Sequence, residues 1–225
     1  MTPRAREAMM KEILCFGDSN TWGADPSGNG RHPRNVRWPG VLAALLGADY
    51  SIIEEGLPGR TTVWEDPVEG DKMGKRHLLP CLQSHLPLDL VILMLGTNDL
   101  KKRYSAATTD IAQGVACLLD IIAGSGSGPG GKAPPVLLVA PPPLGKLSGF
   151  GPMFEGGSEK SRSFSPLLGE LASSRGCPFL DAGAVIRSSD QDGIHLDAGE
   201  HRKLGEAIAK EVRKILRAPA VTAMP

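Results

Sequence analysis

The chain has 225 residues, and its 25 basic and 25 acidic side chains leave no net charge at neutral pH. This balance provides no field to attract nucleic acid or an anionic membrane, so we expect neither partner. The sequence has no apolar run of about 18 residues and no leading apolar stretch typical of a signal peptide. We therefore expect a cytoplasmic protein with a single domain over residues 1–217 and a flexible tail over residues 218–225.

Short apolar segments recur along the chain and are separated by longer segments with helical patterns. This alternation predicts an α/β fold with a five-stranded parallel sheet. The third apolar segment is the most continuous, which indicates a central strand covered on both faces. In chain order the expected strands are Glu12–Phe16, Tyr50–Glu54, Leu88–Leu95, Val136–Ala140 and Pro178–Asp181.

The segments between and after these strands predict four helices, each with apolar residues on one face. Pro166 interrupts the third helix, so we expect a kink or a late start there. Asp197 lies three residues before Glu200, a spacing typical of a capping box at the start of the last helix. The expected helices are Trp38–Leu46, Thr109–Ala123, about 158–175 and about 197–216.

The four cysteines are widely spaced and form no C-x-x-C pair. Their neighbours are mostly apolar, and free cysteine in such surroundings behaves as a small hydrophobic residue. We expect all four to be reduced and buried: Cys15, Cys81, Cys117 and Cys177.

The segment that follows the first expected strand contains Gly17, Asp18 and Ser19. Gly17 would permit a sharp turn, which places Ser19 at the start of the next helix. The first N–H groups of a helix are unpaired and favour developing negative charge, so the position suits a nucleophile. The alternative is an ordinary strand-to-helix turn with a capping Asp or Ser.

A nucleophilic serine needs a base, and His195 is the best candidate among the five histidines. Asp192 lies three residues earlier, so one turn can bring its carboxylate to the imidazole Nδ1 and leave Nε2 for the serine. The alternative is a helix-capping turn with an incidental histidine. A metal site is not expected in this turn, because no second histidine lies at ligand spacing. The other histidines lack a local acid and are expected at the surface or in loops: His32, His77, His85 and His201.

Two further strand ends carry groups that can donate to an oxyanion. Asn98 follows the third expected strand and would project a side-chain amide over the same edge as Ser19. Gly59 lies in a tight turn after the second strand and could direct its backbone N–H toward the site. A glycine or an asparagine in a turn is common when taken singly. Together with Ser19 and the Asp192–His195 pair, however, these residues place the groups that nucleophilic catalysis needs on one edge of the sheet.

The loop over residues 141–157 follows the fourth expected strand, at the edge where parallel sheets bind ligands. Its apolar side chains allow three interpretations: a substrate pocket, packing beneath the loop, or contact with another subunit. These side chains are Leu144, Leu147, Phe150, Met153 and Phe154.

Taken together, these segments resemble the SGNH, or GDSL-type, esterases and lipases. The matching blocks are residues 17–19, 56–59, 96–99 and 192–195, in the order of the family. The sequence around these blocks is similar to that of the bacterial arylesterase branch that includes the mycobacterial acyltransferase and perhydrolase. The resemblance implies a flavodoxin-like three-layer α/β/α fold, and homo-oligomers in which neighbouring subunits restrict a hydrophobic channel.

The resemblance also implies roles for individual residues. Ser19 would be the nucleophile, His195 the general base and then acid, and Asp192 the residue that orients His195. The oxyanion donors would be the N–H groups of Ser19 and Gly59 and the side-chain amide of Asn98. No metal or organic cofactor is implied. Two positions depart from the family pattern, Asn20 where leucine is usual and Glu55 near a frequent asparagine. Neither removes a reacting group, so the resemblance carries over the catalytic roles but not the loop packing or the substrate preference.

We therefore expect a serine esterase that cleaves small, short-chain carboxylic esters through an acyl-serine intermediate. One alternative is transfer of the acyl group to an alcohol or hydrogen peroxide, and another is deacetylation of carbohydrates. A non-catalytic binding protein with the same fold is a third alternative. A phosphate cradle at the serine turn is a fourth, although the chain lacks both glycine-rich phosphate-binding motifs.

Overall fold

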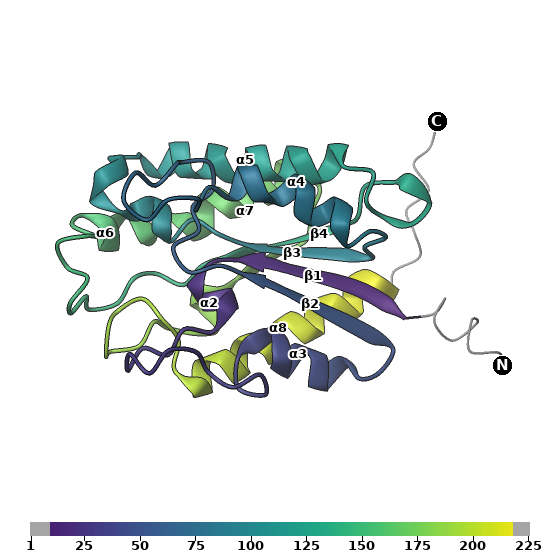
Figure 1. The fold of residues 1–225 in the computed structure, drawn as a ribbon, viewed down its shortest axis with the longest axis horizontal. Helices are drawn as coiled ribbons and strands as arrows, with labels where there is room; N and C mark the ends of the chain where they lie inside the picture. Colours follow the sequence, from purple (N-terminus) through teal and green to yellow (C-terminus); the bar gives the residue numbers. More distant parts are fainter. Residues whose placement is uncertain (1–9, 218–225) are drawn as a thin grey trace.

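The computed structural model describes residues 10–217. Its five strands form one parallel sheet in the order β2-β1-β3-β4-β5 (Figure 1). The predicted parallel sheet is confirmed, whereas the predicted tail over residues 218–225 lies outside the described residues. The strands are β1 (Lys11–Gly17), β2 (Tyr50–Gly56), β3 (Leu90–Met94), β4 (Val136–Ala140) and β5 (Phe179–Asp181).

Helices cover both faces of the sheet and complete three layers (Figure 1). One face carries α3 (Trp38–Leu46) and α8 (Ala198–Arg217). The opposite face carries α4 (Gly74–Ser84), α5 (Thr108–Gly124) and α7 (Phe164–Arg175). Short elements complete the order: α2 (Ser19–Trp22), α6 (Gly157–Ser161), and the 3₁₀ helices η1 (Asn98–Leu100), η2 (Lys102–Tyr104), η3 (Pro129–Gly131) and η4 (Ala182–Ala184).

The central strands send alternate side chains into two separate cores. Leu14 and Phe16 of β1 join the core beneath α4, α5 and α7, whereas Ile13 and Cys15 join the core beneath α3 and α8. All four side chains are fully buried. This two-sided burial explains why β1 and β3 read as continuous apolar runs rather than as alternating patterns.

One predicted strand boundary is wrong, and one predicted helix is divided in two. The third strand is shorter than Leu88–Leu95, because β3 is paired only over Leu90–Met94 while its flanking residues are still buried. The segment over about 158–175, for which a kink or a late start near Pro166 was expected, forms two helices, α6 and α7, and α7 begins at Phe164, as the late start predicts. Pro166 lies in the first turn of α7, where its missing N–H has no helical partner to lose, so the break precedes the proline.

The predicted capping box at α8 is also absent, because both acidic side chains bind a neighbouring loop. The Asp197 carboxylate accepts hydrogen bonds from the side chains of Ser189 and Gln191. The Glu200 carboxylate accepts from the backbone N–H of Arg187 at 3.1 Å. These contacts hold the loop that leads to residues 192–195 against the start of α8.

Several side chains differ in burial from expectation. His201 of α8 is fully buried and its Nδ1 accepts the backbone N–H of Trp38. All four cysteines are free, but only Cys15 is buried, and Cys117 is exposed on α5.

The helix α4 was not predicted, because Pro80 lies within it and only Leu78 and Leu82 mark its apolar face.

The order of the strands determines where a site can form. The chain passes from β1 to β2 on one side, and β3 then pairs with the other side of β1. In parallel sheets, a crevice opens at such a reversal, outside the carboxyl ends of the strands. Ser19 follows β1 and Asn98 follows β3, so both lie at this crevice.

Among the described residues 10–217, none of the helices has the length and apolar character of a membrane span.

Candidate active site

Ser19 begins α2 directly after β1, and its turn is held by neighbouring side chains. The Asp18 carboxylate accepts the backbone N–H of Asn20 at 2.9 Å and so fixes the start of the helix. Gly17 is required by close packing, since a Cβ there would overlap the Thr21 hydroxyl. Ser19 itself is 7% exposed and lines a small cavity.

His195 is oriented by a turn of four residues. One oxygen of Asp192 accepts the backbone N–H groups of Ile194 and His195, at 2.8 and 2.9 Å. Its other oxygen accepts from His195 Nδ1 at 2.6 Å. On the far side of the ring, His195 Nε2 lies 3.0 Å from Ser19 Oγ. The structure therefore brings together, in one hydrogen-bonded chain, three residues that the sequence separates by up to 176 positions.

The same contacts set the charge of Asp192. Partial burial raises the pKa of this carboxyl, but the hydrogen bond from His195 and the two backbone N–H groups outweigh it, and the net pKa is lowered. Asp192 is therefore ionised at neutral pH. An ionised carboxylate at Nδ1 keeps the proton on that nitrogen and leaves Nε2 free to accept the serine proton.

Asn98 and Gly59 border the same cavity as Ser19. Asn98 starts η1, and its Nδ2 donates one hydrogen to the Arg60 carbonyl at 3.2 Å, which leaves the second hydrogen available. Gly59 has φ of +82°, a region that favours glycine, and a Cβ there would overlap the Glu69 carboxylate.

Contacts between distant segments hold these two residues in place. The buried Asp99 carboxylate accepts from both the backbone N–H and the hydroxyl of Thr62. The Arg60 guanidinium donates to the Gly17 carbonyl at 2.8 Å and lies 4.0 Å over the Phe16 ring. No local sequence pattern reveals these supporting roles, although Arg60 adjoins Gly59 and Asp99 adjoins Asn98.

Asn20, one of the two departures from the family pattern, links the serine turn to the histidine turn. Its Nδ2 donates to the backbone carbonyl of Ile194 at 3.2 Å, and the side chain is buried. Ile194 immediately precedes His195. The asparagine therefore ties the turn that carries Ser19 to the turn that carries His195.

A cavity of about 200 Å³ lies against these residues and has two unlike walls. The loop over residues 141–157 supplies an apolar wall, with Phe150 edge-on to His195 at 6.1 Å between ring centroids. Phe154 lines the cavity and also packs into the core, so the loop serves both as packing and as a pocket wall. The cavity is lined by Ser19, Pro58, Gly59, Glu69, Asn98, Lys101, Phe150, Met153, Phe154, Ile194 and His195.

The polar wall of the cavity includes Glu69 and Lys101, and both side chains belong to a cluster of charged residues. Lys101 is buried and pairs with Glu69 and, at 3.4 Å, with Asp66. Asp66 also pairs with Arg103 at 2.8 Å and accepts the Tyr104 hydroxyl at 2.6 Å. Burial raises the pKa of Asp66, but these partners and backbone N–H groups lower it far more, so the carboxylate stays charged. The cluster fixes Glu69 beside Gly59.

A hydrogen-bonded Ser–His–Asp chain at the strand-order reversal of a parallel sheet, next to a small cavity, defines the class of serine hydrolases. Comparison with protein families agrees. The model of the GDSL-like Lipase/Acylhydrolase family matches residues 15–203. The chain belongs to this family, as its sequence resemblance predicted, and is a serine carboxylic ester hydrolase.

Solved structures support the same assignment. The aryl esterase of M. smegmatis is 46% identical, with 91% of this chain and 99% of that chain covered and a TM-score of 0.87. Est24, a carbohydrate acetylesterase from Sinorhizobium meliloti, is 44% identical, with coverages of 91% and 99% and a TM-score of 0.88. A G-D-S-L family lipolytic protein from Veillonella parvula, 17% identical with coverages of 91% and 98% and a TM-score of 0.66, shares the fold. The comparison with curated proteins found no match.

Proposed function

We propose that Ser19 is the nucleophile of a two-step ester hydrolysis. The observation that carries this proposal is the chain of contacts from Ser19 Oγ through His195 to Asp192, at 3.0 and 2.6 Å. His195 Nε2 takes the serine proton as Oγ attacks the ester carbonyl carbon. The tetrahedral intermediate then expels the alcohol, which leaves with the proton from His195, and an acyl-serine remains.

The second step reverses these proton transfers. Water gives a proton to His195 Nε2 and attacks the acyl-serine, and the collapse returns the proton to Ser19 as the acid departs. Asp192 orients the ring and stabilises its charged form in both steps. The oxyanion is stabilised by the N–H groups of Ser19 and Gly59 and by the free amide hydrogen of Asn98. None of these steps assigns a role to a metal or an organic cofactor.

We further propose small molecules with short acyl groups as substrates. A cavity of about 200 Å³ has room for a few carbon atoms beside the serine, and the aryl esterase and acetylesterase relatives are consistent with this choice. Four free cysteines fit the proposed cytoplasmic location. The proposed homo-oligomer rests on the family resemblance and would be measured by light scattering after size-exclusion chromatography.

A p-nitrophenyl ester series from acetate to decanoate tests the proposal. We expect kcat/KM to be greatest for the shortest esters and to fall steeply once the acyl chain exceeds the cavity. Ser19→Ala should lose nearly all activity, whereas Ser174→Ala, a change at an exposed serine on α7, should keep it. Full activity in Ser19→Ala, or a rate that increases up to decanoate, would contradict the proposal.

Acyl transfer is a second candidate, favoured by the apolar wall of Phe150, Met153 and Phe154 beside His195. A wall of this kind can exclude water from the acyl-serine and so favour an alcohol or hydrogen peroxide as acceptor. The ratio of new ester to free acid, measured with vinyl acetate in aqueous alcohol, separates transfer from hydrolysis. Release of acetate from acetylated sugars, compared with p-nitrophenyl acetate, tests carbohydrate deacetylation in the same preparation.

A further inference from the structure

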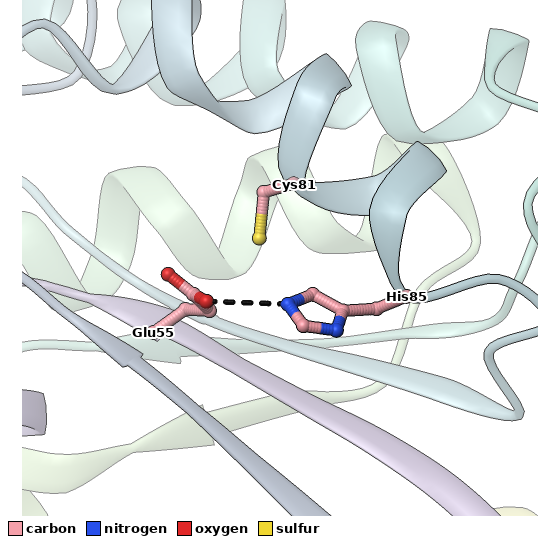
Figure 2. A group of neighbouring side chains, drawn as sticks. All are labelled: Glu55, Cys81 and His85. Carbon is pink, nitrogen blue, oxygen red and sulfur yellow. Dashed lines mark hydrogen bonds and ion pairs between the residues drawn. The ribbon is translucent and has the colours of Figure 1, made fainter.

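A second cluster of chemically active side chains lies outside the active-site cavity (Figure 2). It comprises Glu55 near the end of β2, Cys81 in α4, and His85 directly after α4. One possible ligand atom from each residue, the carboxylate oxygen, the sulfur and an imidazole nitrogen, lies within 4.8 Å of the other two. None of the three residues lines the cavity beside Ser19.

The arrangement follows from the helix and the strand. Cys81 and His85 are four residues apart, so both project from one face of α4, toward the sheet. Glu55 approaches them from β2, and its Oε1 lies 3.2 Å from His85 Nε2 (Figure 2). The three residues are half-buried rather than sealed, with 32% of the His85 side chain and 35% of the Glu55 side chain exposed. An ion and a water molecule can therefore reach the cluster.

The donor set is specific in its chemistry. A thiolate, an imidazole and a carboxylate are all ligands of Zn²⁺, whereas Mg²⁺ and Ca²⁺ prefer oxygen alone. Ligand atoms around tetrahedral zinc are about 3.3–3.8 Å apart, given bonds of about 2.0–2.3 Å. Glu55 Oε1 and His85 Nε2 already have about this spacing, at 3.2 Å. The Cys81 sulfur, within 4.8 Å of both, has to draw in by at most about an ångström, which a change of side-chain torsion can supply.

We propose that Glu55, Cys81 and His85 form a binding site for zinc, with water as the fourth ligand. On binding, the Cys81 thiol loses its proton to solvent and the sulfur bonds to the metal. The thiolate and the carboxylate together balance the two charges of the ion. Arg60 carries a positive charge near this cluster. Its guanidinium is already engaged by the carbonyl oxygens of Gly17 and Glu55 and by the Phe16 ring.

The position of the site gives it a structural consequence. Glu55 directly precedes the turn of residues 56–59, and a metal bound there would tie α4 to the end of β2. Because the ligand set comes together only in the folded chain, metal binding should raise the thermal midpoint of unfolding. This inference does not depend on ester hydrolysis, and its test measures the metal directly.

The competing interpretation is an ordinary ion pair between His85 and Glu55, with Cys81 as a packing neighbour. Titration of the full chain with Co²⁺, after removal of metals by a chelator, separates the two. A Cys81–cobalt bond produces a charge-transfer band in the near ultraviolet, and tetrahedral Co²⁺ absorbs in the visible. Excess Zn²⁺ should remove both bands, and titration calorimetry should give one Zn²⁺ per chain.

Matched variants identify the ligands. Cys81→Ser and His85→Gln should each weaken Zn²⁺ binding by about tenfold or more, and Cys81→Ser should abolish the charge-transfer band. Glu55→Gln, which keeps the shape of the side chain, should also weaken binding. The controls Cys117→Ser, on α5, and His77→Gln, at a partly exposed position of α4, should bind as the unaltered chain does.

Circular dichroism of each variant verifies that the fold is kept, and Glu55→Gln remains informative if a cysteine or histidine variant misfolds. Zn²⁺ should raise the thermal midpoint of the unaltered chain but not that of Cys81→Ser. Absence of a charge-transfer band in the unaltered chain would overturn the proposal. Zn²⁺ binding of equal strength in the unaltered chain and in Cys81→Ser or Glu55→Gln would overturn it as well.

Discussion

The two halves of the active site are built in different ways. The histidine half is a single turn in which Asp192 accepts two backbone N–H groups and the His195 ring. The serine half is assembled from the ends of β1, β2 and β3, and long-range contacts such as the Thr62–Asp99 pair hold it together. Local hydrogen bonds therefore position the proposed base, whereas the order of the strands positions the proposed nucleophile and oxyanion donors.

The largest expected effect comes from breaking the histidine half. Asp192→Asn keeps the shape of the side chain but removes its charge and can favour the wrong imidazole tautomer. In serine protease triads such a change lowers kcat by about 10⁴, and we expect a similar loss with p-nitrophenyl acetate. Asp190→Asn, a neighbouring exposed acid, serves as the control. A loss of less than about tenfold would show that His195 is oriented by another group.

The serine half has its own direct test in Asn98→Ala. Loss of one oxyanion donor lowers kcat by about 10²–10³, and KM should change little because the donor acts on the transition state. Steady-state kinetics with p-nitrophenyl acetate give both constants. Asn35→Ala, at an exposed asparagine, is the control, and full activity in Asn98→Ala would remove this residue from the mechanism.

The pH dependence of stability, compared with and without the Asp99 carboxyl, tests how the serine half is held together. Burial raises the pKa of Asp99 to about 6, partly offset by the Thr62 hydrogen bonds, and its second oxygen has no hydrogen-bond partner among the described residues. The folded state therefore holds the proton more tightly than the unfolded state. As the pH rises from about 4 to about 6, only the unfolded chain gains by ionising, and the free energy of unfolding falls by up to about 3 kcal/mol.

Asp99→Asn cannot ionise, so this variant should lose that fall. Urea unfolding at several pH values should show the variant gaining stability relative to the unaltered chain as the pH rises through this window. Asp18, whose pKa burial also raises to about 6, is present in both proteins and largely cancels in the comparison. A difference in stability that does not change with pH would contradict the role of Asp99.

The smallest expected effect concerns the link between the two halves. Asn20→Ala removes the hydrogen bond to the Ile194 carbonyl, and one such bond contributes about 0.5–1.5 kcal/mol. We expect kcat/KM to fall by roughly two- to tenfold. Asn20→Asp, which cannot donate to the carbonyl, should behave likewise. Unchanged kcat/KM in both variants would show that the serine and histidine turns keep their distance without this bond.

The same contrast explains what could be predicted from the sequence. The strands β1, β3 and β4 were predictable because each is a largely continuous apolar run buried on both faces. The acid–histidine pair was predictable because it lies in one turn. The start of α8 near Asp197 was predicted correctly, but the capping box was not, since Asp197 and Glu200 bind a loop rather than the helix N–H groups.

Other features depend on contacts that no local pattern encodes. The apolar face of α4 is weak and contains Pro80, so its helical state depends on packing against the sheet. The bracing of Gly59 and Asn98 by Arg60 and Asp99 joins segments about 37 residues apart. Likewise, the approach of Glu55 to Cys81 and His85 requires β2 and α4 to be in place.

The central claim is that the hydroxyl oxygen of Ser19 attacks the ester, and covalent labelling of this serine tests the claim most directly. A serine-directed phosphonate should add its mass once per chain, abolish ester hydrolysis, and map to the tryptic peptide that contains Ser19. Ser19→Ala should take up no label under the same conditions. Labelling of a different residue, or retained hydrolysis after complete labelling at Ser19, would contradict the account.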